Sequence, residues 1–437
     1  MSFAAPPESS APEATPEGAG RRGIAAWCLY DWANSAFPTV IVTFVFAAYF
    51  TNVIAETPEI GTGQWGLAMG LSGLVIALLS PVLGAIADQN GRRKPWIAVL
   101  ALICVAVGAL LWTVEPVAGA LVWALVLVTA ANVAFEIGTV FYNAMLPEVA
   151  PRGKMGRISG WAWGAGYAGG LACLAACLLL FVQPEVPLFG LDKETYEHVR
   201  ATGPFVGLWF LVFALPMFLF TPDRPASGKP AGEAVRSGLE TLWETLKKLP
   251  RYGTILRFLI ARMFYTDGLN TLFAFGGIYA AGTFGMSFDE ILIFGILLNV
   301  TAGFGAVGFA WIDDWLGPKR TVLISVCFLI LLGTAILLVE SKLWFYLLGC
   351  AMGIFIGPAQ SASRTLMARL APAEIRTEMF GLYALSGKAT AWMGPFLVGS
   401  VTVWADSQRW GMATILVLFV IGAVLLLPLR EPRQTSD

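Results

Sequence analysis

The chain has 437 residues, of which 57% are hydrophobic and only 13% are charged, and its net charge is −1. Soluble globular chains carry about 25% charged residues, and apolar surface left in water is costly, so the composition excludes a soluble protein. The near-neutral charge gives no electrostatic case for nucleic-acid binding. The six cysteines and the single histidine, His198, show no metal-ligand spacing. We therefore expect no metal and no cofactor.

The first 22 residues are rich in Pro, Glu, Ala and Ser, which is typical of a disordered tail, and they lack the order of a signal peptide. Apolar segments long enough for a membrane-spanning helix, about 20 residues, then recur along the chain. Twelve are predicted: 24–54, 63–87, 95–114, 117–147, 156–182, 204–221, 253–284, 287–312, 320–340, 342–369, 376–404 and 408–429.

These segments predict an all-α membrane protein with twelve transmembrane helices in two pseudo-symmetric halves. The predicted organisation is a cytoplasmic tail (1–22), a six-helix half (23–221), a linker (222–252), a second six-helix half (253–430) and a short tail (431–437).

The linker contains an amphipathic pattern. Leu239, Leu242, Trp243, Leu246 and Leu249 recur at helical spacing, and charged residues fill the opposite face. We expect this helix to lie along the membrane surface.

Lys and Arg predict the orientation, because the cytoplasmic connectors of membrane proteins carry most of the positive charge. With the N-terminus inside, the inner segments hold twenty of these residues and the outer segments four. Both termini and the linker are therefore expected to be cytoplasmic. Between a bacterial cytoplasmic membrane and a vacuole, we favour the former.

The two halves repeat each other in sequence. Three motifs occur twice, in the same order along the chain. The matched pairs are Asp31-x-x-Asn34 with Asp267-x-x-Asn270, the loop from Asp88 to Lys94 with the loop from Asp314 to Arg320, and Ala150-Pro151 with Ala371-Pro372. Two parallel repeats of this kind are a known plan of secondary transporters.

The loop after the second span resembles the signature loop of the major facilitator superfamily, on the evidence of Gly84, Asp88, Gly91, Arg92 and Arg93. Gly91 permits a tight turn, and Asp88 can sit beside a helix N-terminus or an arginine. The basic residues are suited to hold the loop at the inner surface. A purely topogenic role for these charges is the alternative.

Residues 30–37 (YDWANSAF) resemble the first-helix signature of the autophagy-related vacuole effluxer branch of that superfamily. Residues 146–151 (LPEVAP), followed by 157–160 (RISG), are similar to its junction between spans 4 and 5. The resemblance covers roughly residues 21–430. It implies efflux of small solutes, with amino acids as a candidate class, since the branch includes fungal amino-acid exporters and bacterial members.

Polar residues inside the predicted spans are candidates for function, because a charge at the centre of a spanning helix costs about 2.5–3.5 kcal/mol. They share one helical face in spans 1, 4, 7 and 10, the cavity-lining helices of the superfamily. The candidates for substrate binding or proton coupling are Asp31, Asn34, Asn132, Glu136, Asp267, Asn270, Gln360 and Lys388. The candidates for a gate or a signature loop are Gly84, Asp88, Gly91, Arg92, Arg93, Asp314, Gly317 and Arg364.

Two alternatives stay open for each buried charge. Glu136 near mid-span is either a proton-coupling or substrate-amine site, or half of a structural ion pair with Lys388. Asp31 and Asp267 form either an inner gate or packing network with Arg364, or act directly in transport.

An enzyme is not expected, because the sequence lacks His-Glu-x-x-His and Gly-x-Ser-x-Gly motifs. An ATP-driven pump is disfavoured by the lack of a P-loop. The main hypothesis is a secondary active transporter that works by alternating access, and the alternative is a sensor or scaffold with a transporter fold. The expected partners are a small-molecule substrate, protons as the candidate coupling ion, and the lipid bilayer. We expect a monomer and no nucleic-acid partner.

Overall fold

The computed structural model describes residues 19–151 and 153–431, which are helical and contain no strand. The helices of the first half are α1 (Arg21–Asn34), α2 (Val45–Tyr49), α3 (Pro58–Asn90), α4 (Lys94–Leu110), α5 (Leu121–Ala144), α6 (Leu146–Val149), α7 (Met155–Cys177), α8 (Glu197–Arg200) and α9 (Thr202–Phe220). The others are α10 (Ala231–Lys248), α11 (Gly253–Phe284), α12 (Phe288–Leu316), α13 (Pro318–Leu338), α14 (Lys342–Leu370), α15 (Arg376–Lys388), α16 (Met393–Ala405) and α17 (Gln408–Leu426). The predicted tails, 1–22 and 431–437, lie largely outside the described residues.

Several spans include segments of other helical types. The π-helical segments are η1 (Phe37–Phe44), η2 (Phe50–Ile54) and η5 (Leu178–Val182). The short 3₁₀ segments are η3 (Leu111–Thr113), η4 (Ala118–Ala120), η6 (Leu188–Gly190) and η7 (Leu249–Arg251). The first span changes to π-helix next to Pro38, which has no N–H to donate, and the Thr43 hydroxyl donates to the Pro38 carbonyl at 2.9 Å. Such π segments are frequent at functional sites.

Ten helices of the described chain are long and apolar enough to cross a membrane, so the count of twelve stays a prediction. The two predicted spans outside this set are 253–284 and 376–404. The first is a single helix, α11, whose apolar character is reduced by Arg257, Arg262 and Asp267. The second is not the continuous helix that we predicted, because it is divided into α15 and α16.

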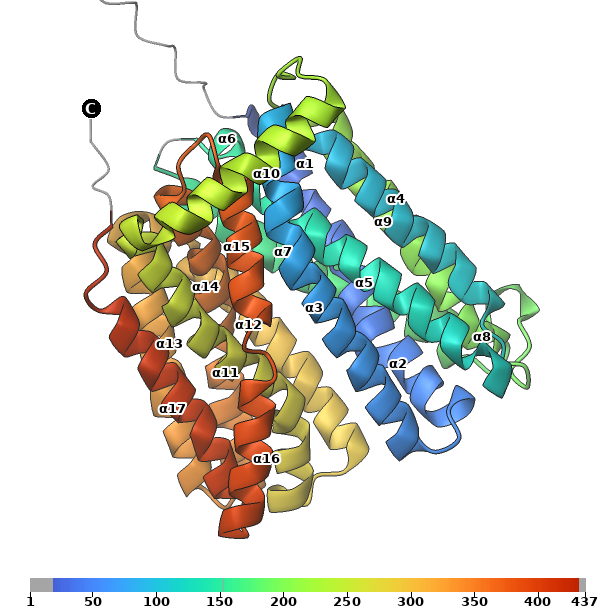
Figure 1. The fold of residues 1–437 in the computed structure, drawn as a ribbon. Coiled ribbons are helices and arrows are strands. Elements are labelled where there is room, and N and C mark those ends of the chain that lie inside the picture. Colours follow the sequence, from blue (N-terminus) through green and yellow to red (C-terminus); the bar gives the residue numbers. More distant parts are fainter. Residues whose placement is uncertain (1–18, 152, 432–437) are drawn as a thin grey trace, which may run out of the picture.

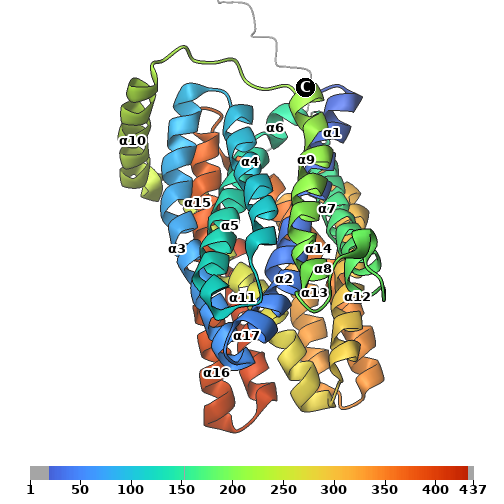
Figure 2. The same ribbon diagram turned by 90° about the vertical axis from the view of Figure 1, so that its right-hand side faces the viewer.

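The helices form two bundles, one from each half, which α10 bridges at one end (Figure 1). We call this the linker end. Across the halves, α3 packs against α15 and α7 packs against α12. From the linker end the two bundles diverge (Figure 1), and α10 lies on the outside of α3 in the turned view (Figure 2).

The amphipathic helix α10 lies against α3, where Gly238 approaches the backbone of Ile86. Leu242 is buried, whereas Leu239 and Trp243 are exposed. The predicted apolar face is therefore divided between protein contact and an exposed stripe.

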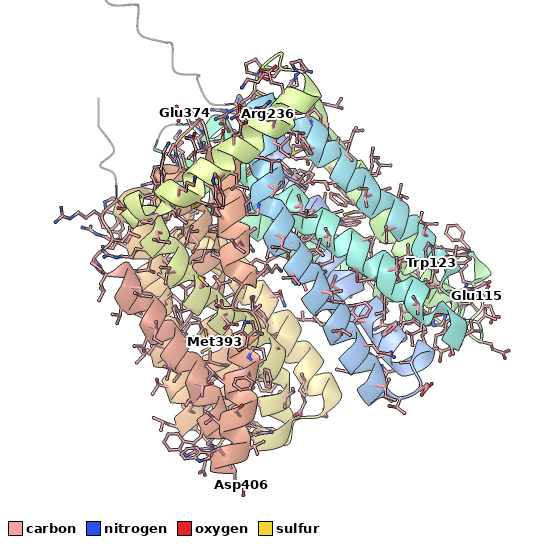
Figure 3. The ribbon with its side chains drawn as sticks, in the orientation of Figure 1. Glu115, Trp123, Arg236, Glu374, Met393 and Asp406 are labelled. Atoms are coloured by element: carbon pink, nitrogen blue, oxygen red, sulfur yellow. The ribbon has the colours of Figure 1, made fainter. Side chains whose placement is uncertain are left out.

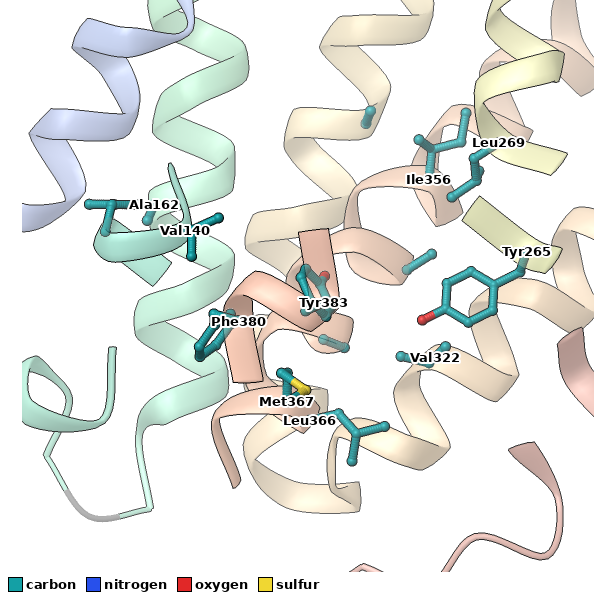
Figure 4. Packing of buried hydrophobic residues seen from close by; sticks show 14 of the residues in the cluster. Val140, Ala162, Tyr265, Leu269, Val322, Ile356, Leu366, Met367, Phe380 and Tyr383 are labelled. Atoms are coloured by element: carbon teal, nitrogen blue, oxygen red, sulfur yellow. The ribbon is translucent and has the colours of Figure 1, made fainter. Parts of the chain in front are cut away.

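Small residues allow the halves to approach closely. A β-carbon at Gly84 of α3 would lie 2.6 Å from the Thr377 carbonyl oxygen, and one at Gly160 of α7 would lie 2.5 Å from the Ala306 carbonyl oxygen. Around this junction the buried apolar side chains include Val140 and Ala162 of the first half and Phe380 of the second (Figure 4).

Candidate functional site

A cavity of about 290 Å³ lies between the two halves. Its walls combine hydroxyl and amide groups with aromatic rings and one carboxylate–guanidinium pair. The lining residues are Asp31, Asn34, Ser35, Pro38, Thr39, Phe135, Thr139, Asn143, Trp163, Gly166, Tyr167, Leu171, Phe273, Asn299, Gln360 and Arg364.

Arg364 of α14 joins three elements of the first half. Its Nη1 donates to Asp31 Oδ2 at 3.1 Å and to Asn143 Oδ1 at 3.2 Å. Its Nε and Nη2 donate to the hydroxyl and the carbonyl oxygen of Ser159 at 2.9 and 2.7 Å. The side chain is only 2% exposed, so this full set of hydrogen bonds offsets the cost of burying the charge.

Aromatic rings surround the same guanidinium. Its central carbon lies 5.1 Å from the ring centroid of Trp27, 5.8 Å from that of Tyr142 and 5.7 Å from that of Trp163. Such cation–π contacts stabilise a cation further when water is excluded. Arg364 is thus held rigidly at the cavity wall.

Asp267 does not join this network, although its motif matches that of Asp31. Its Oδ2 accepts the backbone N–H of Gly394, at the start of α16, at 2.9 Å. Asn270 is exposed and lies one helical turn before the cavity residue Phe273. The structure therefore separates Asp267 from Arg364.

The remaining polar candidates are divided between contacts across the halves and contacts within one half. Lys388 donates to Glu136 Oε1 at 2.7 Å across the halves, and both side chains are about a quarter exposed. Gln360 accepts from the Tyr167 hydroxyl at 2.7 Å, also across the halves. Asn132, by contrast, donates to the Ser72 hydroxyl of its own half at 2.7 Å and is not among the lining residues.

The two signature-loop aspartates make equivalent contacts. Asp88 accepts from the Thr377 hydroxyl at 2.5 Å and from the Glu378 N–H at 2.9 Å. Asp314 accepts from the N–H groups of Gly156 and Arg157 at 2.8 and 3.2 Å. Each carboxylate therefore binds the first turn of a helix in the opposite half, where unpaired N–H groups and the helix dipole favour a negative charge.

Other members of the signature loops turn or support them. Gly91 ends α3 with φ +87° and Gly317 ends α12 with φ +89°, a region that favours glycine. Arg93 is 1% exposed and donates to Glu148 at 2.8 Å, to the Ala144 carbonyl oxygen at 3.0 Å and to the Thr377 hydroxyl at 2.8 Å. Arg92, in contrast, is exposed.

Glu148 is a contact residue that our site prediction missed. Besides Arg93, it binds Arg224 at 2.6 Å and Arg376 at 2.7 Å. Burial opposes its ionisation, but the three arginines hold the pKa of Glu148 below its ordinary value. The sequence offered one signal for Glu148, since it is an acidic residue in a connector that we predicted to be basic. Ser159 was also missed, because a serine in a spanning helix has no distinctive pattern.

Among residues 19–151 and 153–431, no group of three or more His, Cys, Asp or Glu side chains is placed to hold a metal ion.

The fold and cavity define a class: a multi-pass integral membrane transporter of the major facilitator type. The solved structure of FucP in the outward conformation aligns with a TM-score of 0.74 at 13% identity, over 94% of this chain and 100% of FucP. The proton:xylose symporter XylE aligns with a TM-score of 0.72 at 14% identity, over 94% of this chain and 96% of XylE. These likenesses confirm the predicted fold.

The chain belongs to the family described as vacuole effluxer Atg22 like, whose model matches residues 66–437. The uncharacterized MFS-type transporter YxiO of Bacillus subtilis is 26% identical over 418 residues, covering 94% of this chain and 95% of YxiO. Autophagy-related protein 22 of Coccidioides immitis is 23% identical over 302 residues, 62% of this chain. That match spans about half of the fungal protein, 48% of its length. The predicted branch is thereby confirmed.

Proposed function

We propose that the protein is a secondary active transporter that exports a small solute through the central cavity by alternating access. The observation that carries this proposal is the cavity itself, which lies between two separable halves and has Arg364 and Asp31 in its wall. The cross-half bonds of Asp88, Asp314 and Glu148 gather at the linker end. Opening them while the opposite end closes would expose the same cavity to the other side.

The orientation proposed here places the linker end in the cytoplasm of a bacterial cell. The excess of Lys and Arg in the predicted inner segments supports this. In that orientation the end at which the two bundles diverge (Figure 1) faces outward.

Amino acids are the substrate class that the cavity favours. A zwitterion needs an anion and a cation at short range, and Asp31 and Arg364 supply both in one wall. The bonds of Arg364 use four of the five guanidinium N–H groups, so a substrate carboxylate could accept from the fifth, while the substrate ammonium group binds Asp31. The volume of about 290 Å³ suits a small solute.

Proton coupling is proposed to involve the Glu136–Lys388 pair, which bridges the halves at 2.7 Å. A proton on Glu136 would remove the attraction between the two side chains and loosen the contact. A purely structural pair is the alternative. The variant Glu136→Gln distinguishes the two roles. A coupling role predicts that proton-driven accumulation of substrate is lost while exchange of substrate across the membrane is retained. A structural pair predicts poor folding that Lys388→Met partly restores.

The test of transport is efflux from proteoliposomes that contain the purified protein and a mixture of labelled amino acids, with and without a pH gradient. We expect selective release of a subset, abolished by Asp31→Asn. Liposomes with the exposed-site variant Arg92→Ala are the matched control. Release equal to that of empty liposomes, for amino acids and for a wider solute panel, would contradict the proposal and favour a sensor or scaffold.

A further inference from the structure

A break in a membrane-embedded helix lies beside an unpaired acid. α15 ends at Lys388 and α16 begins at Met393, which lies between the two ends of the bundle (Figure 3). In transporters, broken helices often place their free ends at ion or substrate sites. Here the residue at the start of α16 that makes the contact is Gly394, whose N–H donates to Asp267 Oδ2.

Two buried oxygen atoms at this break have no hydrogen-bond partner among the described residues: Oδ1 of Asp267 and Oγ1 of Thr271. Asp267 is 1% exposed and Thr271 is 0% exposed. They lie one turn apart on α11, so they share a helical face. A side chain added to Gly394 would collide with Thr271 Oγ1 and lie 3.1 Å from Asp267 Oδ1, so both atoms face the same glycine.

Asp267 also has no cation within ion-pair distance in the described chain. α16 itself carries no charged residue. Six charged or titratable side chains on α11 and on the helices packed against it bind other groups. They are Arg262 on α11 (bound to the Tyr383 carbonyl and Ser386), Tyr265 on α11 (Ser363), Lys388 on α15 (Glu136), Arg364 on α14 (Asp31), Asp314 on α12 (Gly156 N–H) and Arg409 on α17 (the Leu337 and Val339 carbonyls). Tyr279 on α11, Asp313 on α12, Arg369 on α14 and Glu378 on α15 have buried polar atoms without a partner among the described residues.

The magnitudes favour a neutral acid at this position. The N-terminus of α16 stabilises a carboxylate by about 0.3–1 kcal/mol, or about 2 kcal/mol in the best geometry. An isolated buried carboxylate costs far more than that, and such a group is neutralised instead. Each unpartnered buried polar atom adds a further cost of about 1–3 kcal/mol.

We propose that Asp267 is a proton-binding site at the α15–α16 break, distinct from the Glu136–Lys388 pair. A single proton on Oδ1 neutralises the buried carboxyl group, while Oδ2 still accepts from the Gly394 N–H. A metal cation fits less well, because hard cations take about six oxygen ligands and only two free side-chain oxygens face this point. Its use as a coupled proton rests on the proposed transport function.

The test is infrared spectroscopy of the purified, lipid-reconstituted protein at neutral pH, without added substrate. The protonated carboxyl group has a C=O stretching band separate from that of a carboxylate. We expect this band in the wild type, its loss in Asp267→Asn, and its retention in the control Glu136→Gln. Asn is neutral at this position, and its amide oxygen can still accept from the Gly394 N–H.

Thr271→Val provides a second measurement that keeps the acid, in case Asp267→Asn does not fold. Removing the hydroxyl group that faces the same glycine should shift the band, because it changes the surroundings of the acid. A band that neither variant changes would overturn the proposal, and so would a band that disappears when Na⁺ is added. If this test fails, the transport proposal still stands, because the measurement requires no substrate. If the efflux assay fails, the infrared band still reports whether Asp267 is protonated.

Discussion

Two pairs of aspartates occupy matching positions in the two halves. The pair in the signature loops makes similar contacts in both halves, whereas the pair in spans 1 and 7 does not. Asp88 and Asp314 bind matching positions: Thr377 and Glu378 in one half, Gly156 and Arg157 in the other. Both keep this role because each accepts from at least one backbone N–H group, which the residues at a helix start offer.

Asp31 and Asp267 diverge because their contacts depend on a side chain. Asp31 faces Arg364. Counted back from the Ala-Pro pair of each half, the position that matches Arg364 is Asn143, which is neutral. Asp267 therefore meets no equivalent cation and caps α16 of its own half. A sequence repeat thus preserves backbone-directed contacts, whereas side-chain pairs must be specified in both partners.

The largest effect is expected for Arg364→Met. It leaves Asp31 buried without its cation, and breaking a buried pair costs about 3–5 kcal/mol. Asp267→Asn should cost less than about 1 kcal/mol, because no ion pair is lost there. The two variants are compared by their thermal unfolding in detergent, with size-exclusion chromatography as the readout. The double variant Asp31→Asn, Arg364→Met should recover part of the loss. Equal destabilisation by Arg364→Met and Asp267→Asn would remove the distinction between the halves.

The next effect concerns Glu148, which has three arginine partners although its matched position, Arg369, is basic. Hydrogen bonds to charged groups contribute about 1.5–3 kcal/mol each, so Glu148→Gln should favour opening of the linker end. Spin labels at the exposed positions 92 and 374, one in each half, report that opening as a longer distance.

Acid should have the same effect on the wild type. Because the folded pKa of Glu148 is lowered, its stabilisation is complete above the ordinary pKa of glutamate and is lost as the pH falls through the lower folded value. The Glu148→Gln distance should not respond to pH in this window. A pH response of equal size in the variant would assign the effect to another group.

A smaller effect tests the symmetric contact between helices. Gly84→Ala and Gly160→Ala each place a methyl group against backbone of the opposite half, and overpacking costs about 1–3 kcal/mol. Both should shift the labels at 92 and 374 apart by a similar amount. Gly73→Ala is the control, since nothing lies within 4 Å of its added β-carbon. A longer label distance in only one of the two variants would show that the two junctions are not equivalent.

The smallest effect is expected within one signature loop. Arg92→Ala removes an exposed side chain and should change the unfolding free energy by less than about 0.5 kcal/mol. Arg93→Ala removes a buried cation that binds Glu148 and Thr377, and its melting temperature should fall clearly. Equal melting temperatures would mean that the loop acts through its total charge alone.

Much of the architecture follows from the sequence by itself. Long apolar segments must be helices in a bilayer, because every backbone group needs a partner there, and the repeated motifs indicate two related halves. The signature loop and residues 30–37 were sufficient to predict the branch that the family match confirms. The resemblance to the superfamily, with which the polar stripes agree, also predicted a cavity between spans 1, 4, 7 and 10, each of which contributes lining residues.

Only the tertiary structure decided which polar residues meet. Asn132 shares a helical face with Glu136 in sequence, yet it bonds Ser72 within its own half, because helix rotation depends on packing and not on spacing alone. The break between α15 and α16 was not predicted, since residues 376–404 read as one long span. Ser159 and Glu148 bind arginines that are distant in the chain. Local sequence fixes which face of a helix is polar, whereas close packing of the two halves determines which partner that face receives.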